Sequence, residues 1–309
     1  MNYTKREDTF LSSNEVVQIK YYVYVPNGEI KALFQITHGM CEYIERYEPF
    51  IDYLTGHGFL VFGNDHLGHK GSVEKLEDLG YMGRDNGWKH MYEDVHTLSK
   101  MMKKEYPGFK LFLLGHSMGS FVARAIMANY PTDYDGVIIS GTSGRNPMTG
   151  LGLKLVSFLM LFKKPRGRSA FLVKTAFKGY NSRFENVVYG SEWLSRDVAI
   201  QEAYLKDPYT NFSFTLAGYK DLFSILDYVT NDNWYNLIPE ELPIFMVSGD
   251  MDPVGSWGDG VREVDEKLRQ KERKHYEMKL YPDMRHEVLN EIGKEEAYED
   301  IRKWVEKYL

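Results

Sequence analysis

Short apolar runs alternate along the chain with longer amphipathic stretches, and this alternation constrains the fold more than any other feature. It predicts an α/β protein with a mostly parallel sheet covered by helices on both faces. The inner runs are continuously apolar, as expected for strands buried on both faces. The predicted strands are Val16–Val25, Ala32–Ile36, Leu60–Phe62, Leu111–Leu114, Val137–Ile139, Ile244–Val247 and Tyr276–Leu280. The helical patterns are Trp88–Tyr106, Phe121–Tyr130 and Lys294–Leu309.

One long segment interrupts this rhythm between two predicted strands. Residues 144–241 show no comparable strand pattern, and they far exceed the ~2 to 6 residues usual between a strand and a helix. We therefore predict a helical cap over 144–241, inserted into a core made of residues 1–143 and 242–309. Within the cap, Arg145–Phe184 carries nine Lys and Arg and no acid, whereas Glu185–Glu241 carries ten acids and three bases.

Composition and charge argue against nucleic-acid binding, disulfides, cysteine-rich metal sites and membrane spans. The formal net charge of −6 over 309 residues gives no overall attraction for nucleic acid. The lone Cys41 excludes an internal disulfide and a cysteine-rich zinc site, and it suits a reducing compartment, so we expect a cytoplasmic protein. The N-terminus mixes both signs of charge, unlike a signal peptide. The longest apolar run, Leu155–Phe162, is interrupted by Ser157 and is far shorter than the ~20 residues of a spanning helix.

The pattern Gly-x-Ser-x-Gly, centred on Ser117, lies directly after an apolar strand and directly before a helical stretch. This is the context of a nucleophile elbow, a strained turn that lifts the serine hydroxyl above the sheet. Gly115 and Gly119 flank the serine because side chains at those positions would collide in so tight a turn. We therefore predict that Ser117 is a nucleophile. We interpret the adjacent His116 as a packing residue whose side chain points away from it.

A serine nucleophile needs a histidine base and a carboxylate, which in this fold follow the serine in the order acid, then histidine. His286 follows the last predicted strand and so lies where α/β sites form, whereas His275 precedes that strand, at the wrong end. Two carboxylates follow the strand before it. Asp252 is preferred because it lies beyond a glycine turn and before Pro253, and Asp250 remains open as the alternative.

The oxyanion of an acyl-transfer intermediate needs two backbone amides, one beside the nucleophile and one from the loop after an early strand. We predict that Met118 and Met40 supply these amides. His38, in the same early loop, precedes the elbow and is interpreted as a buttress of the loop. Cys41 is interpreted as a packing residue, because a far better nucleophile is already in place.

Five motifs in order resemble the monoacylglycerol lipase and lysophospholipase branch of the α/β-hydrolases. The resemblance covers nearly the whole chain and implies a triad of Ser117, Asp252 and His286, an oxyanion hole from Met40 and Met118, and no cofactor or metal. Two departures concern substrate preference: Tyr43 stands where the family often has His, and Lys70 where Gly is usual. The motifs are His38-Gly39-Met40-x-Glu42, Asn64-Asp65-His66-Leu67-Gly68-His69, Gly115-His116-Ser117-Met118-Gly119, Ser248-Gly249-x-x-Asp252-Pro253 and Arg285-His286-Glu287.

The leading hypothesis is hydrolysis of a monoacyl ester, either a lysophospholipid or a monoacylglycerol, through an acyl-enzyme. A peptidase or acyltransferase using the same triad is the alternative enzyme, because the triad cannot distinguish leaving groups. A ligand-binding module without activity is the alternative from another class. Two hypotheses remain for the basic half of the cap. Its charges could pair with those of the acidic half, or four cations beside the apolar run could touch an anionic lipid surface. These cations are Lys163, Lys164, Arg166 and Arg168.

Overall fold

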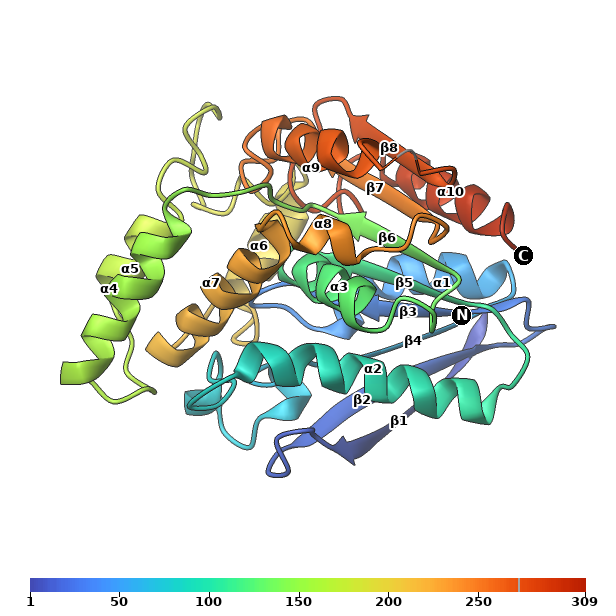
Figure 1. The fold of residues 1–309 in the computed structure, drawn as a ribbon, viewed down its shortest axis with the longest axis horizontal. Helices are drawn as coiled ribbons and strands as arrows, with labels where there is room; N and C mark the ends of the chain where they lie inside the picture. Colours follow the sequence, from blue (N-terminus) through green and yellow to red (C-terminus); the bar gives the residue numbers. More distant parts are fainter. Residues whose placement is uncertain (272) are drawn as a thin grey trace.

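The computed structural model describes residues 1–271 and 273–309, and within them an eight-stranded sheet forms the centre (Figure 1). The strand order is β1-β2-β4-β3-β5-β6-β7-β8. β1 and β2 are antiparallel, as are β2 and β4, whereas the remaining neighbours are parallel. The predicted α/β fold with a mostly parallel sheet is thus confirmed. The strands are β1 (Tyr3–Leu11), β2 (Gln18–Pro26), β3 (Ala32–Thr37), β4 (Phe59–Asn64), β5 (Leu111–His116), β6 (Gly136–Ser140), β7 (Ile244–Gly249) and β8 (Tyr276–Tyr281).

The first strand, β1, was not predicted from the sequence. Its residues pair with β2 in an unbroken antiparallel register from Tyr3–Pro26 to Leu11–Gln18. Seven of its nine positions carry polar or charged side chains or are exposed, because β1 is an edge strand with little core beneath it. Charged side chains on such an edge oppose pairing with another chain.

Helices cover both faces of the sheet. On one face, α2 (Gly87–Glu105), α3 (Met118–Asn129) and α9 (Asp259–Arg269) contribute to one buried apolar cluster. On the other face, α1 (Glu48–Gly56) and α10 (Lys294–Glu306) contribute to a second cluster. The central strands β3, β4, β5, β6 and β7 are buried at every position, which explains their continuous apolar sequences. Short 3₁₀ turns lie at Ile44–Tyr47, Lys70–Ser72 and Leu76–Asp78.

Between β6 and β7 the chain forms helices and, among the residues that the structure describes, no strand. Figure 1 shows α4 and α5 standing apart from the sheet, with α7 between them and α3. The division of the chain into this cap and a core stays a prediction. The helices are α4 (Thr149–Phe162), α5 (Ala170–Ala176), α6 (Val198–Lys206), α7 (Leu216–Thr230) and α8 (Trp234–Leu237). None of the helices described in this structure is both long enough and apolar enough to cross a membrane.

Arg124 of α3 joins the helix of the elbow to both ends of this inserted segment. Its guanidinium is fully buried and donates to the carbonyl of Ser143 at 2.9 Å and to that of Val229. The same group lies over the Trp234 ring, 4.4 Å from its centroid, and the Trp234 indole donates to the Arg124 carbonyl at 2.7 Å. A cation–π contact and carbonyl acceptors thus replace a carboxylate as partners of this buried cation.

Candidate active site

Ser117 occupies a sharp turn between β5 and α3. Its φ of 55° and ψ of −121° are rare for a residue with a side chain, and such strain is concentrated at functional sites. Its amide donates to the Ser140 carbonyl at 2.9 Å, which ties the turn to β6. A Cβ on Gly115 would collide with the Gly119 carbonyl, and a Cβ on Gly119 would collide with the Thr37 carbonyl. Close backbone approach therefore requires both glycines of the motif.

His286 lies in the loop after β8 and pairs with a buried carboxylate. Its Nδ1 is 2.9 Å from Oδ2 of Asp252, which is completely buried in the loop that follows β7. The carboxylate also accepts the Val254 amide at 2.8 Å and the Ser248 hydroxyl at 3.3 Å, so its orientation is fixed. Burial alone would lower the pKa of His286, but the attraction of Asp252 outweighs it, and the pKa lies above its usual 6.5.

The other candidate carboxylate and the other downstream histidine lie elsewhere. Asp250 accepts the backbone amide of Asp283 at 2.8 Å, in the turn after β8, and so stabilises that turn. The carbonyl of His275 accepts the amide of Ile244 at the start of β7, at the opposite end of the strand from Asp252. The structure thus brings His286 together with Asp252, and not with Asp250.

His116, next to Ser117 in the sequence, packs against the ring of His286. Its ring centroid is 4.7 Å from that of His286, and its Nδ1 is 3.3 Å from the Ser140 hydroxyl. Burial and the neighbouring His286 hold the pKa of His116 well below its usual value, so its ring stays neutral. His116 therefore packs, as we expected, and its packing partner is the His286 ring.

The loop after β3 approaches the elbow closely. A Cβ on Gly39 would lie 2.9 Å from Cβ of Ser117, so only glycine allows this approach. Among the described residues, the amides of Met40 and Met118 donate to no backbone or side-chain acceptor. Both amides belong to segments that border Ser117, and the Met118 amide is at the N-terminus of α3, where the helix dipole favours negative charge.

Comparison with known proteins identifies the family of the chain. The family model described as serine aminopeptidase, S33 (Hydrolase_4) matches residues 28–293. The chain belongs to this S33 family. Together with its relatives, this makes it a serine hydrolase. A monoacylglycerol lipase of Mycolicibacterium smegmatis is 27% identical over 99% of both chains. The human monoglyceride lipase is 33% identical over 44% of this chain and 43% of its own length.

Solved structures show the same fold. A thermostable carboxyl esterase from Bacillus coagulans in complex with glycerol superposes with a TM-score of 0.92 at 29% identity, over 99% of both chains. A soluble variant of the monoglyceride lipase from Saccharomyces cerevisiae has a TM-score of 0.77 at 20% identity, over 100% of this chain and 96% of its own. The predicted membership in the α/β-hydrolases is confirmed.

A buried ion cluster in this S33 hydrolase joins the loop after β3 to the loop that carries His286. Arg46 donates to Glu42 at 2.9 Å and to both carboxylate oxygens of Glu287, at 2.9 and 2.8 Å. Glu42 also accepts the Gly39 amide and the Tyr47 hydroxyl. Burial raises the pKa of Glu42 to about 6, although Arg46 opposes the rise. Sequence reasoning missed this cluster, because its only local signal is the four-residue spacing of Glu42 and Arg46, and Glu42 lies outside the 3₁₀ turn that carries Arg46.

Three buried histidines, His38, His66 and His69, lie in or beside the loop after β3. His38 bonds the Gly39 carbonyl through Nδ1 at 2.8 Å and accepts the His66 amide through Nε2 at 2.9 Å, and His69 accepts the Cys41 amide at 3.3 Å. Burial lowers the pKa of His66 to about 3 and that of His69 to about 4, so both are neutral at pH 7.

Cys41 is fully buried in the same region, and burial raises the pKa of its thiol well above 9. These contacts fit the structural roles expected for His38 and Cys41. No group of three or more His, Cys, Asp or Glu side chains within the described part of the chain is arranged like a metal site.

Proposed function

We propose that the protein hydrolyses the ester bond of monoacyl lipids, monoacylglycerol or lysophospholipid, with Ser117, His286 and Asp252 as its catalytic triad. The 2.9 Å contact between His286 and the buried Asp252 carries this proposal, together with the packing of His286 against His116, the residue before the strained Ser117. The substrate class is supported by the monoacylglycerol lipase of Mycolicibacterium smegmatis and by the carboxyl esterase of Bacillus coagulans, both matched over 99% of their length.

The proposed reaction proceeds in two halves. His286 takes the proton of the Ser117 hydroxyl as the oxygen attacks the ester carbonyl, and Asp252 stabilises the resulting imidazolium. The amides of Met40 and Met118 bind the tetrahedral oxyanion. His286 then gives its proton to the leaving alcohol, which leaves the acyl group on Ser117. A water molecule, deprotonated by His286, releases the fatty acid and restores the serine.

A panel of substrates tests the proposal most economically. Esters graded from acetate to long-chain monoacylglycerol and lysophospholipid are compared with an aminoacyl amide, using the wild type and Ser117→Ala. We expect turnover of monoacyl lipids that Ser117→Ala abolishes, and little turnover of the amide. Faster turnover of the aminoacyl amide than of any ester would replace the proposal with a peptidase.

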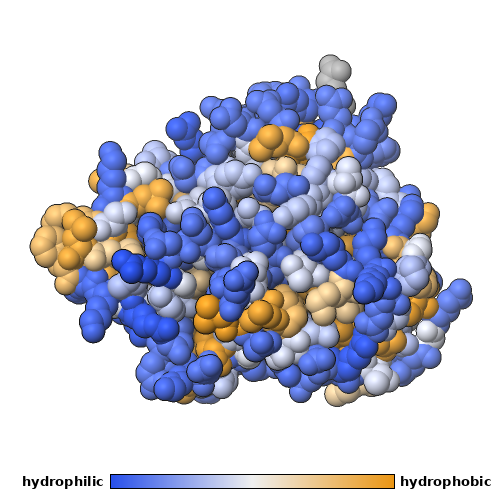
Figure 2. Space-filling model, turned by 60° about the horizontal axis from the view of Figure 1, so that its bottom comes forward, coloured by the Kyte–Doolittle hydropathy of each residue, from blue (hydrophilic) through white to orange (hydrophobic). Residues whose placement is uncertain are grey.

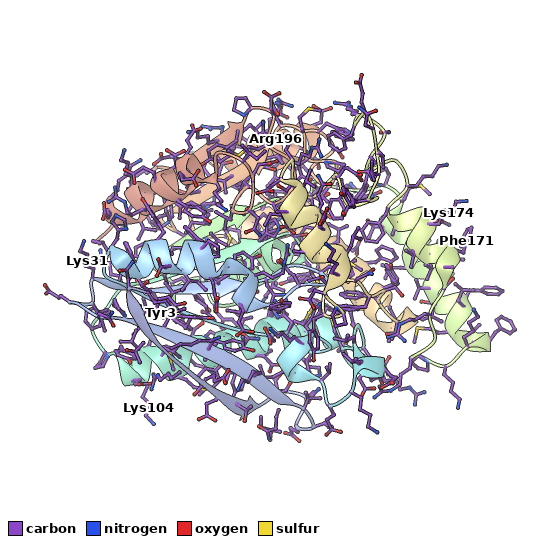
Figure 3. All side chains as sticks on the ribbon, turned by 180° about the vertical axis from the view of Figure 1, so that it is seen from behind. Tyr3, Lys31, Lys104, Phe171, Lys174 and Arg196 are labelled. Atoms are coloured by element: carbon purple, nitrogen blue, oxygen red, sulfur yellow. The ribbon has the colours of Figure 1, made fainter. Side chains whose placement is uncertain are left out.

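We also propose that residues 144–241 act as the cap over the substrate, and that its tip touches lipid surfaces. Large apolar side chains at the tip of α4 and on α5 are exposed, including Leu161 at 78% and Phe162 at 75%. Figure 2 shows an apolar patch at the left end of the molecule, where Figure 1 places α4 and α5. Figure 3 shows Phe171 and Lys174 of α5 pointing outward. An apolar patch beside cations is typical of contact with an anionic lipid surface.

The four cations first assigned to this contact divide into two pairs. Lys163 and Lys164 are exposed beside the apolar tip. Arg166 instead forms an ion pair with Asp78 and lies over Tyr81, with its guanidinium 4.0 Å from the ring centroid. Only the two lysines are therefore assigned to lipid contact.

Arg168, like Arg166, is bonded to residues of the core and so joins the cap to it. It donates to three backbone carbonyls, and among the described residues it forms no ion pair. These carbonyls belong to Glu77, Leu79 and Ser213. Among the described residues, no ion pair joins the basic half of the cap to its acidic half.

The lone, buried Cys41 supports a cytoplasmic location as part of this proposal.

A further inference from the structure

An indole ring from the inserted segment lies against the His286 ring. The centroids of Trp193 and His286 are 5.2 Å apart, and their planes are tilted by 38°. A cation within about 6 Å of an indole centroid is stabilised by the negative face of the ring. The contact therefore favours His286 when it carries a proton, which is its state after it deprotonates a nucleophile.

Trp193 belongs to a short segment that is bonded along its length to the loop after β8. The His286 amide donates to the Trp193 carbonyl at 3.3 Å, and the Glu287 amide donates to the Leu194 carbonyl at 2.8 Å. In the other direction, the Arg196 amide donates to the Glu291 carboxylate at 2.8 Å. These bonds fix the backbone that carries the indole relative to the backbone that carries the imidazole.

Side chains reinforce the same junction. Arg285 donates to the Glu192 carbonyl at 2.5 Å and to the Ser195 carbonyl at 3.3 Å. The Ser195 hydroxyl donates to the Asn290 carbonyl at 3.1 Å and is completely buried. The segment Glu192–Arg196 is thus a fixed part of the His286 loop, unlike the exposed tip of α4.

Trp193 is the least buried residue of the central part of this segment. Glu192, Leu194 and Ser195 are all buried, whereas Trp193 is only partly buried. The rings of Phe177 and Tyr180 also pack against Trp193, with centroid distances of 5.8 and 5.1 Å. Neither ring is paired with His286 among the described aromatic contacts.

From these contacts we infer that Trp193 is a positioning residue for His286, which holds the imidazole in its productive orientation and stabilises its protonated form. The inference rests on the proposed function, because it assumes that His286 is the base. It assigns the segment Glu192–Arg196 of the inserted region to the catalytic centre.

The inference is tested by substitutions that distinguish the effect of the aromatic ring face of Trp193 from the effect of its apolar packing. Trp193→Leu keeps apolar volume without a π face, Trp193→Phe keeps a face, and Phe177→Leu is the control within the same cluster. With a short water-soluble ester, we expect kcat to fall about tenfold in Trp193→Leu with little change in KM. Trp193→Phe should retain at least a third of the wild-type kcat, and Phe177→Leu at least half.

The downfield proton resonance of the His286 Nδ1–H group, which bonds to Asp252, supplies a second readout that a merely structural role would not move. We expect this resonance to shift or broaden in Trp193→Leu and to keep its position in Phe177→Leu. If Trp193→Leu does not fold, Trp193→Met is measured in its place with the same expectation. Equal kcat in the Trp193 and Phe177 variants, with an unchanged resonance, would overturn the inference.

The Ser117→Ala variant separates this failure from that of the proposed function. If Ser117→Ala is inactive while Trp193→Leu behaves like Phe177→Leu, only the role of Trp193 is lost. If Ser117→Ala keeps its activity, the triad itself is wrong, whatever the Trp193 variants show.

Discussion

The helices α3 and α4 are both rich in apolar residues, yet they lie in opposite environments. In α3, every residue from Met118 to Met127 is buried, whereas in α4 only Thr149 and Val156 are. Apolar composition predicts a helix in both cases but does not reveal what will cover it. The apolar side chains of α3 pack in the core, whereas those at the tip of α4 are exposed and available for contact with another surface.

The two helices also differ in how they are held. Packing and the buried Arg124 fix α3 to the strands and to the ends of the inserted segment. Close to the tip of α4, in contrast, the anchors to the core are Arg166 and Arg168, which reach Asp78 and nearby carbonyls. This difference predicts that changes around α3 affect every substrate, whereas changes at the α4 tip affect only substrates in lipid surfaces.

The largest effect is expected at the N-terminus of α3. Ser117→Ala should abolish turnover of a soluble aryl ester and of vesicle-bound lipid alike, because both need the same nucleophile. The thermal unfolding midpoint should stay close to that of the wild type, since the turn accommodates a smaller side chain. More than a few per cent of wild-type turnover in clean protein would contradict the role of Ser117.

The next largest effect concerns the two carboxylates after β7. Asp252→Asn should lower kcat by orders of magnitude on both kinds of substrate, because the amide cannot stabilise the His286 imidazolium. Asp250→Asn should do much less, since Asp250 accepts the Asp283 amide in a turn and, among the described residues, has no contact with His286. Steady-state kinetics on the two variants decide the assignment, and the reverse ranking would transfer the acid to Asp250.

The pH dependence sharpens the same assignment. Protonated His286 cannot accept the serine proton, so kcat/KM should fall as the pH falls through the pKa of His286, which lies above 6.5. In Asp252→Asn, the residual activity should show this limb at lower pH, because the charge that raises the pKa of His286 is gone. A limb that moves upward in that variant would show that Asp252 does not act on His286.

At the α4 tip we expect a loss of at least about tenfold that is confined to substrates in lipid surfaces. Replacing Phe158, Leu161 and Phe162 with Ser should lower activity on anionic vesicles. Each large apolar side chain that is buried on membrane contact contributes about 1.5 to 3 kcal/mol of binding free energy, and the substitutions remove this contribution. Turnover of a soluble short ester should not change, since these side chains are already in water. Equal losses on both substrates would show that the tip supports the fold instead.

The smallest effects separate the two pairs of cations beside the tip. Lys163→Glu with Lys164→Glu should reduce vesicle activity and its sensitivity to salt, since each base near an anionic surface contributes about 1 kcal/mol. Arg166→Glu with Arg168→Glu should instead lower the thermal midpoint by a few degrees, because bonds to the core are lost. A loss of stability in the lysine variant, with only a loss of salt response in the arginine variant, would contradict this assignment of the two pairs.

Most of the sheet could be predicted because its strands are buried on both faces and so have continuous apolar sequences. The strand β1 could not, because its sequence from Tyr3 to Leu11 is dominated by exposed polar and charged residues. Its place depends on pairing with β2, a partner that no local pattern indicates. The exposure of Leu161 and Phe162 could be raised only as a hypothesis, since apolar sequence does not report tertiary contact.

The candidate site was predictable where a motif fixes local backbone geometry. The glycines around Ser117 and the positions of His286 and Asp252 at strand ends are of this kind. The salt bridge of Arg46 to Glu287 joins residues 241 positions apart, and the contact of Trp193 with His286 depends on how the inserted segment folds back. No spacing in the sequence reports such contacts.

Reaction with a fluorophosphonate followed by peptide mass spectrometry tests the central claim most directly, because this probe modifies only an activated serine. We predict one adduct per chain on the peptide that contains Ser117, with labelling strongly slowed in His286→Ala and no adduct in Ser117→Ala. An adduct on another residue, or wild-type protein that does not react, would contradict the account.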